Sequence, residues 1–284
     1  MIYREQVHEN GLLFTEKKGI PLFTFPLFDR TGLVHAAFST RMGGVSENEF
    51  ATMNFTSSRG DDPQKTRENF RRFCAAMDVN PNRLVFSRQT HTTNVRVVTE
   101  ADAGKGFLTE TDYEDVDGLI TDVPGLVLAT FYADCIPLLF LDPVRKVVAT
   151  SHSGWRGTLA GMGEVTVRKM TETFGCRRED ILAAIGPGIC RDCYEVGDEL
   201  YDAFREKWTT EEVQRIFVRK PGEKWHLDLW EANVLVLKRA GITEDHLAVT
   251  NVCTCCNSKE LFSHRASHGK RGNLGAFISL KAET

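Results

Sequence analysis

Two side chains that could act as nucleophile, base or metal ligand, Cys135 and His152, stand at the ends of two apolar stretches joined by a turn. The segment 132–157 reads YADCIPLLFLDPVRKVVATSHSGWRG. Pro143 presets one backbone dihedral of the turn, and Asp142 can accept hydrogen bonds from the backbone that follows it. The segment therefore predicts a β-hairpin that brings a thiol and an imidazole toward each other.

The register of this hairpin decides whether the two side chains meet. If Leu141 pairs with Lys146, Cys135 lies directly opposite His152. Directly opposed residues of an antiparallel pair hold their Cβ atoms about 4.5–5.5 Å apart on one face of the sheet. A one-residue bulge would send them to opposite faces. We expect a Cys–His contact at the rim of a sheet, where Gly154 lets backbone or a ligand approach closely.

Two chemistries fit this contact. In a Cys–His dyad, the imidazole lowers the pKa of the thiol and the thiolate attacks a carbonyl carbon. In a zinc site, Cys135 and His152 are both ligands and a third protein ligand is required. His91, expected in a strand rich in Val and Thr over 83–100, can supply it and leaves the fourth position open for water. His91 favours the metal site, and the dyad stays the alternative.

The scaffold that positions these residues is expected to be one α/β domain over residues 1–284. At this length roughly three quarters of the unfolded surface can be buried. The net charge of −4 argues against non-specific nucleic-acid binding, which needs a basic surface. The most apolar region, 124–141, is too short and too interrupted to span a membrane. The N-terminal residues lack the apolar core of a signal peptide, so we expect a cytoplasmic protein with reduced cysteines.

Short strands and amphipathic helices alternate along the chain, and the tight turns favour mixed rather than purely parallel sheets. The first predicted helix begins at Pro63 with Asp62 as its cap, because proline suits the first helical position and aspartate the cap. A second is predicted over 158–175, ending at Gly175. Two more are predicted within 193–208 and 225–242.

The remaining cysteines are expected to be structural. The motif CRDC, residues 190–193, has C-x-x-C spacing, but we identify no matching second half. The three thiols of CTCC, residues 253–256, are interpreted as the end of a buried strand rather than as a C-x-x-C motif. A second metal site is therefore not expected there.

Seven segments occur in an order and at spacings that resemble a known family. They are FSTRMGGVS, QTH, DGLIT, ADCIPLLFLDP, HSGWRGTLAG, IGPGIC…CYEVG and SHRASHGKRG. Over about residues 20–280 the chain resembles the YfiH/YlmD-like family, also called laccase-domain or multicopper polyphenol oxidase proteins. The resemblance implies a layered α/β/β/α (α+β) fold with mixed sheets. That fold is shared with CNF-toxin deamidases, which use a Cys–His pair, and is named a cysteine hydrolase fold.

The same resemblance implies purine nucleoside chemistry. It implies phosphorolysis of adenosine, inosine and S-methyl-5′-thioadenosine, together with adenosine deaminase activity. It implies zinc held by His91, Cys135 and His152, with copper as the alternative metal, and purine nucleosides and phosphate as partners. A Cys–His hydrolase, for example in peptidoglycan precursor editing, stays open as the alternative activity.

Phosphorolysis requires a group that binds an anion. Arg41 suits this catalytic role, because a guanidinium can bind phosphate through two hydrogen bonds and the adjacent glycines expose backbone N–H donors. Arg156 and Arg265 are rival candidates, and Asn54 and Gln89 are further candidate substrate contacts. For deamination, a carboxylate must shuttle protons.

Glu195 and Asp117 are both candidates for this shuttle, and the sequence does not choose between them. Asp134, next to Cys135, is expected to point to the other face of the strand. A copper-dependent laccase is disfavoured, because a trinuclear cluster is commonly built from paired H-x-H ligands. The eight histidines of the chain form no such pair.

Overall fold

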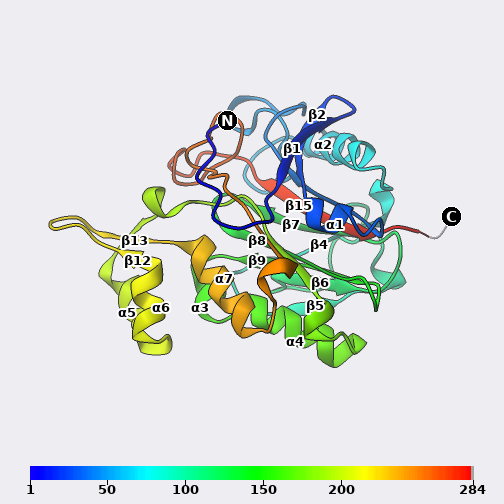
Figure 1. The fold of residues 1–284 in the computed structure, drawn as a ribbon. Coiled ribbons are helices and arrows are strands. Elements are labelled where there is room, and N and C mark those ends of the chain that lie inside the picture. Colours follow the sequence, from blue (N-terminus) through cyan, green and yellow to red (C-terminus); the bar gives the residue numbers. More distant parts are fainter. Residues whose placement is uncertain (283–284) are drawn as a thin grey trace.

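The computed structural model describes residues 1–282, and they form four stacked layers (Figure 1). Helix α2 (Pro63–Ala76) covers the outer side of a first six-stranded sheet. A second six-stranded sheet packs against the inner side of the first. Helices α3 (Trp155–Leu159), α4 (Met162–Phe174) and α7 (Leu229–Arg239) cover the outer side of the second sheet. The expected mixed α/β class is confirmed.

Both large sheets are mixed. The first has the order β1-β2-β3-β15-β7-β4 and the second β14-β10-β8-β9-β6-β5. The pairs β4/β7, β5/β6 and β10/β14 are parallel, and all other neighbours in these two sheets are antiparallel. The strands of the first sheet are β1 (Leu13–Lys17), β2 (Ile20–Thr24), β3 (Val34–Ser39), β15 (Leu274–Leu280), β7 (Val127–Tyr132) and β4 (Leu84–Phe86). Those of the second are β14 (Leu247–Val249), β10 (Leu182–Ile185), β8 (Ile136–Asp142), β9 (Val147–Ser153), β6 (Gly118–Thr121) and β5 (Val95–Val97).

A smaller antiparallel sheet and three further helices complete the fold. The small sheet has the order β11-β13-β12, with strands Glu195–Val196, Trp225–Leu227 and Phe217–Val218. The helices are α1 (Pro26–Asp29), α5 (Asp198–Lys207) and α6 (Thr210–Ile216). No helix within residues 1–282 is long and apolar enough to cross a membrane.

The central strands are buried on both faces. Leu139 and Val148 lie in the apolar layer between the two large sheets, whereas Leu138 and Ala149 face the helices. Every residue of β8 and β9 is buried. This explains why β8 is an unbroken apolar run rather than an alternating one.

The predicted hairpin exists, but its register was wrong by two residues. The structure pairs Asp142 with Val147 and Pro137 with His152. Asp142 stays in the strand and its Oδ1 accepts hydrogen bonds from two backbone N–H groups of the turn, as expected for this residue. Lys146 has a φ of 53° and belongs to the turn, so pairing starts one residue later on each side than predicted.

The predicted ends of the helices are confirmed, but one helix that was predicted to be continuous is divided into two. Asp62 accepts a hydrogen bond of 2.7 Å from the Gln64 N–H and Pro63 opens α2, as predicted. The helix predicted over 158–175 is divided into α3 and α4. Gly161, with a φ of 77°, separates the two, and Gly175 ends α4 in the left-handed conformation.

Candidate active site

The second sheet and one loop bring Cys135, His152 and His91 together. The candidate ligand atoms of the three side chains all lie within 4.8 Å of one another. Cys135 Sγ lies 3.9 Å from His91 Nε2. The predicted pairing of Cys135 opposite His152 was wrong, because Pro137 occupies that position. Side chains alternate with a period of two, so a shift of two residues keeps Cys135 and His152 on one face.

Gly154 leaves room for this cluster. A Cβ at Gly154 would lie 3.0 Å from both Cys135 Sγ and His91 Cδ2, closer than most such contacts. A side chain at this position would therefore displace the thiol or the imidazole.

His91 does not lie in a strand, contrary to the prediction for 83–100. The segment contains the two short strands β4 and β5, and His91 stands in the loop between them with a φ of 67°. The loop is held by the Asp117 carboxylate, which accepts hydrogen bonds from the backbone N–H groups of Thr90, His91 and Thr92 at 2.9, 3.0 and 3.0 Å. The carboxylate thereby orients His91 through its backbone.

Asp117 also holds His152. Its Oδ1 lies 2.8 Å from His152 Nδ1, and the Asp117 side chain is fully buried. A ring nitrogen fixed in this way leaves Nε2 as the nitrogen available for a ligand or a proton. Asp117 therefore connects both histidines, and both of its carboxylate oxygens take part in these hydrogen bonds.

The electrostatics of the cluster favour a thiolate. Burial opposes ionisation of Cys135, but the charge of His152 and hydrogen bonds from both histidines lower the pKa of the thiol to about 6. Burial also opposes protonation of His152, and the Cys135 charge together with Asp117 raises the pKa of the imidazole to about 9. Both shifts favour the charged forms, a thiolate beside an imidazolium.

The donor set fits a metal ion. A thiolate and two imidazoles within 4.8 Å are the ligand types that zinc prefers, and three protein ligands leave one tetrahedral position open. The carboxylate behind His152 matches the outer partner that metal-binding histidines commonly have.

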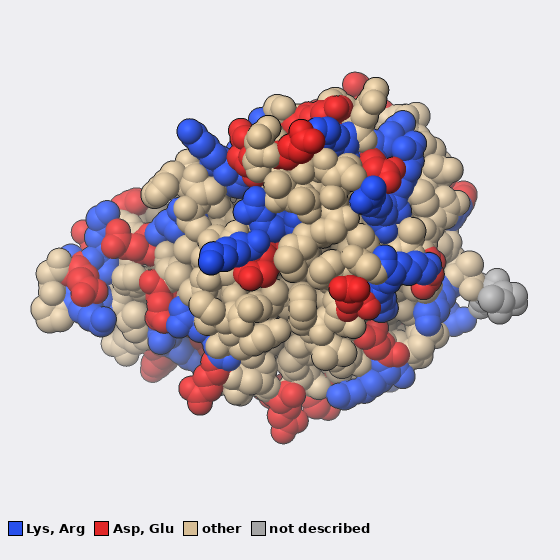
Figure 2. Space-filling model, turned by 90° about the horizontal axis from the view of Figure 1, so that it is seen from above, with Lys and Arg blue, Asp and Glu red and all other residues tan. Residues whose placement is uncertain are grey.

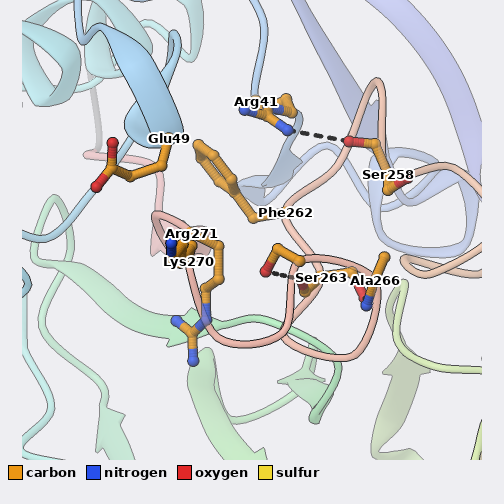
Figure 3. Close-up of a pocket in the computed structure, with 9 residues that line it drawn as sticks. Arg41, Glu49, Ser258, Phe262, Ser263, Ala266, Lys270 and Arg271 are labelled. Atoms are coloured by element: carbon orange, nitrogen blue, oxygen red, sulfur yellow. Dashed lines mark hydrogen bonds between the residues drawn. The ribbon is translucent and has the colours of Figure 1, made fainter.

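A pocket of about 310 Å³ lies among residues of the C-terminal segment and the loop after β3 (Figure 3). Arg41 lines it, with its guanidinium 4.4 Å from the centre of the Phe262 ring. Its Nε donates to the Ala51 carbonyl at 2.7 Å and its Nη1 to the Ser258 carbonyl at 3.0 Å. The remaining lining residues are Glu49, Ser263, Ala266, Ser267, Lys270 and Arg271.

Arg271 also lines this pocket. Burial and the neighbouring Arg59 lower the pKa of its guanidinium to about 10, while the charges of Asp134 and Cys135 act to raise it. Figure 3 shows its side chain extending away from Arg41. Arg41, Lys270 and Arg271 place three basic side chains around one pocket, which suits the pocket to an anion. Arg265 is the only residue of the motif SHRASHGKRG that was predicted to belong to the site. Lys270 and Arg271 were missed, and the clustering of basic residues in this motif was the available signal.

The comparisons with known proteins agree with this architecture. The family described as "Multi-copper polyphenol oxidoreductase laccase" matches residues 35–281. The chain belongs to this family.

Relatives of this laccase-domain chain include enzymes of two named activities. It is 34% identical to "Purine nucleoside phosphorylase YlmD" of Bacillus subtilis (strain 168), over 87% of this chain and 89% of the relative. It is 35% identical to "Adenosine deaminase RL5" of an unknown prokaryotic organism, over 81% of this chain and 87% of the relative. The crystal structure of YlmD from Geobacillus stearothermophilus superposes with a TM-score of 0.87 at 32% identity, covering 95% of this chain and 100% of that one.

The family description names copper, but within residues 1–282 the donors do not form a copper cluster of the laccase type. Among residues 1–282, the candidate metal-binding groups are the Cys135 cluster and a second group made only of cysteines. Two histidines in one group are too few for a trinuclear cluster and a blue-copper site.

The other candidate substrate residues are placed as follows. Gln89 exchanges two hydrogen bonds with the Phe131 backbone, at 2.8 and 2.7 Å, and so fixes the His91 loop to β7. Asn54 is buried; it donates to Asp61 Oδ2 at 2.8 Å and accepts from the Asn273 N–H at 2.9 Å. Arg156 is exposed and lies 4.3 Å from the centre of the Trp155 ring.

Arg265 and three carboxylates are the remaining candidate residues. Arg265 donates to the carbonyls of Cys193 and Glu195 at 3.1 and 2.8 Å. Asp134 accepts from Thr254 Oγ1 at 2.6 Å and from the Arg265 N–H at 2.7 Å. It has a φ of 86° and lies before β8, not within a strand as predicted. Glu195 is exposed and pairs with a lysine at 3.2 Å, whereas Asp117 is buried behind His152.

Charges of both signs are mixed on the face shown in Figure 2, where Lys and Arg lie beside Asp and Glu. No continuous basic surface covers that face, in keeping with the net charge of −4. A surface with mixed charges of this kind does not favour a polyanion such as a nucleic acid.

Proposed function

We propose that this chain is a zinc-dependent purine nucleoside enzyme. It cleaves adenosine, inosine and S-methyl-5′-thioadenosine with phosphate to free base and ribose or methylthioribose 1-phosphate, and it also deaminates adenosine. The observation that carries the proposal is the His91, Cys135 and His152 donor set, together with a pocket lined by Arg41, Lys270 and Arg271. The named activities of the relatives support it.

Zinc bound by His91, Cys135 and His152 would supply a Lewis acid and lower the pKa of a bound water. Protein groups around the three donors hold these side chains in position. Asp117 fixes the orientation of His152 and the conformation of the His91 loop. Copper is the alternative metal for the same donors. Because ligand cysteines must stay reduced, we also propose a reducing compartment such as the cytoplasm.

In phosphorolysis the bond between ribose C1′ and purine N9 breaks, a phosphate oxygen bonds to C1′, and the departing purine takes up a proton. Arg271 and Arg41, which line the same pocket, are our candidates for holding the phosphate. Arg156 and Arg265 stay candidates for the nucleoside side. In deamination, water adds at C6 and ammonia leaves, which requires no phosphate.

One observation favours a second candidate function, a Cys–His hydrolase. Asp117, His152 and Cys135 follow one another as carboxylate, imidazole and thiol, and the pKa of the thiol is lowered to about 6. This order would suit attack on a carbonyl carbon by the thiolate. A hydrolase of this kind would not need His91 or a metal ion.

Product analysis tests the proposed function. Zinc-loaded and chelated protein are incubated with adenosine, with and without phosphate, and adenine, inosine and ribose 1-phosphate are assayed. We expect adenine and ribose 1-phosphate only with phosphate, inosine with or without it, and neither after chelation. Cys135→Ala should be inactive, whereas Cys74→Ala, at a buried cysteine of α2, should retain activity. No product under any condition would overturn the proposal.

A further inference from the structure

Four cysteines outside the candidate active site form a second cluster. Cys190, Cys193, Cys253 and Cys256 place their sulfurs within 4.8 Å of one another. Each half has C-x-x-C spacing, because the outer two cysteines of CTCC are three residues apart. The interpretation of residues 253–256 as lacking this motif was therefore wrong, and so was the conclusion that CRDC has no second half.

The fold brings the two halves together from positions 63 residues apart in the sequence. Strands β10 and β14 are parallel neighbours, so the loops after their carboxyl ends leave the same edge of the sheet. A further bridge between Gly188 and Cys253 continues this pairing into the loops. The first motif then enters the short 3-10 helix η5 (Arg191–Cys193), and the second turns back over it.

The spacing of the sulfurs fits a single tetrahedral ion. Four thiolates at about 2.3 Å from zinc lie about 3.8 Å from one another. Cys193 Sγ and Cys256 Sγ are 3.5 Å apart, and all four sulfurs lie within 4.8 Å. The cysteines are free thiols, since a disulfide would hold two sulfurs at about 2.05 Å. A four-iron cluster would bind each cysteine through a different iron and hold the sulfurs farther apart.

Hydrogen-bond donors surround the sulfurs. The N–H groups of Cys190 and Cys256 donate to Cys253 Sγ at 3.2 and 3.4 Å. Arg4 Nη2 lies 3.2 Å from Cys190 Sγ and 3.0 Å from Cys256 Sγ. Arg4 is itself held by its backbone, which donates to the Asn251 carbonyl at 2.8 Å. Four thiolates around one divalent ion carry two excess negative charges, which the guanidinium offsets in part.

We propose that Cys190, Cys193, Cys253 and Cys256 bind one zinc ion in a closed structural site. All four tetrahedral positions are filled by protein sulfurs, which leaves none for water or substrate. The N-terminal segment, the loop after β10 and the loop after β14 meet at this ion. The site is therefore distinct in chemistry and role from the open site at Cys135.

The closed site supports the backbone next to Cys135. Thr254, between two of the cysteines, donates to Asp134 Oδ1 at 2.6 Å through its hydroxyl and to the Gly188 carbonyl at 3.1 Å through its N–H. The Ile189 N–H donates to the Asp134 carbonyl at 2.9 Å. Both cysteine loops thus contact Asp134, which precedes Cys135 and has a φ of 86°. Loss of the ion should loosen this turn.

Metal analysis of single variants tests the proposal. The full chain is purified under reducing, zinc-replete conditions and its zinc is measured by elemental analysis. We expect Cys193→Ser and Cys256→Ser to hold one zinc ion fewer than the unmodified chain. Cys255→Ser is the matched control, since Cys255 lies in the same turn and outside the cluster, and it should keep the full content. Equal zinc in all four proteins would overturn the proposal.

A second variant keeps the test decisive if a cysteine variant does not fold. The triple variant His91→Ala, Cys135→Ala, His152→Ala leaves the closed site intact. It should hold one zinc ion, and replacement by Co²⁺ should give the thiolate charge-transfer absorption and the intense visible bands of a tetrahedral all-sulfur site. No bound metal, iron with sulfide in place of zinc, or two disulfides found by mass spectrometry in this folded variant would each overturn the proposal.

Discussion

At the scale of single residues, the candidate active site depends on the carboxylate of Asp117, which is not itself one of the three candidate metal ligands. Asp117 is fully buried, yet it accepts hydrogen bonds from three successive backbone N–H groups of the His91 loop and contacts His152. Burial acts to raise its pKa, but His152 and these donors lower it overall, so it stays ionised. One charge therefore sets the positions of two candidate ligands.

Asp117→Asn should weaken the site strongly. The amide nitrogen cannot accept a hydrogen bond, so buried donors would be left without a partner at a cost of about 1–3 kcal/mol each. We expect zinc affinity and phosphorolysis to fall about 10–100-fold, as for other partners of metal-binding histidines. The control is Asp115→Asn, at an exposed carboxylate that accepts from Thr90 Oγ1 at 2.8 Å. Equal zinc affinity in both variants would contradict the role of Asp117.

Asp102 predicts an acid-sensitive contribution to stability. Burial acts to raise its pKa, but Lys105 at 2.8 Å, the Thr99 N–H at 2.9 Å and Arg96 at 3.3 Å lower it overall. A carboxyl whose folded pKa is below its unfolded pKa stabilises the fold above the unfolded pKa, at about 3.9, and loses this effect as the pH falls.

Urea unfolding of Asp102→Asn measures this contribution. The variant should be less stable than the unmodified chain at pH 7, and the difference should shrink as the pH falls below about 4. The reason is that the unmodified Asp102 becomes protonated there and resembles the neutral amide. A difference that stays constant from pH 7 to pH 3 would contradict the assignment.

At the scale of elements, the close approach of β9 to the His91 loop requires a glycine. Gly154 and Gly157 stand in the same motif, HSGWRG, but their surroundings differ. A Cβ at Gly154 would press on Cys135 and His91 at 3.0 Å, whereas a Cβ at Gly157 would meet its nearest atom at an ordinary 3.5 Å. The two glycines form a matched pair for testing the site.

Gly154→Ala should lower phosphorolysis and zinc affinity by at least tenfold while the fold is retained. Gly157→Ala should leave both unchanged, and alanine in helix α3 should stabilise the chain by up to about 1 kcal/mol. Zinc content, product formation and thermal unfolding are measured for both. Unchanged activity in Gly154→Ala would show that the cluster tolerates the extra atom and would contradict the tight packing.

The elements that could be predicted from the sequence are those with local causes. Asp62 and Pro63 start α2, Gly175 ends α4, and the Asp142 turn closes a hairpin, all through neighbouring residues. The hairpin register depended on the left-handed conformation of one turn residue, Lys146. The residue types around the turn did not indicate this conformation.

The missed features have causes that lie far away in the sequence. The His91 loop takes its shape from Asp117, 26 residues later, so the Val- and Thr-rich pattern around it suggested a strand instead. The four-cysteine cluster needs parallel strands β10 and β14 to unite its halves. The additional thiol of Cys255 obscured the spacing of the second half.

At the scale of the whole molecule, the candidate ligands Cys135 and His152 lie on the face of the second sheet that packs against the first. Leu139 and Val148 continue that face into the apolar layer between the sheets. Stability of this layer should therefore affect the whole chain. We predicted one domain over 1–284, and that prediction implies a single cooperative unfolding transition.

Leu139→Ala should destabilise the chain by about 2–5 kcal/mol, because it removes buried methyl groups and leaves a cavity between the sheets. Leu108→Ala, at a leucine with 51% exposure, should change the free energy of unfolding by no more than about 0.5 kcal/mol. Urea unfolding at fixed zinc concentration, followed by two spectroscopic probes, measures both. Two separate transitions, or equal effects of the two substitutions, would contradict a shared core.

The central claim is that His91 is a metal ligand and that phosphorolysis depends on it. The most direct test measures zinc content and adenosine phosphorolysis together in His91→Ala and in the unmodified chain. The account predicts that His91→Ala keeps the zinc of the four-cysteine site, loses the second zinc ion and loses phosphorolysis. Full zinc content with undiminished phosphorolysis would contradict it, because a Cys–His dyad needs neither His91 nor metal.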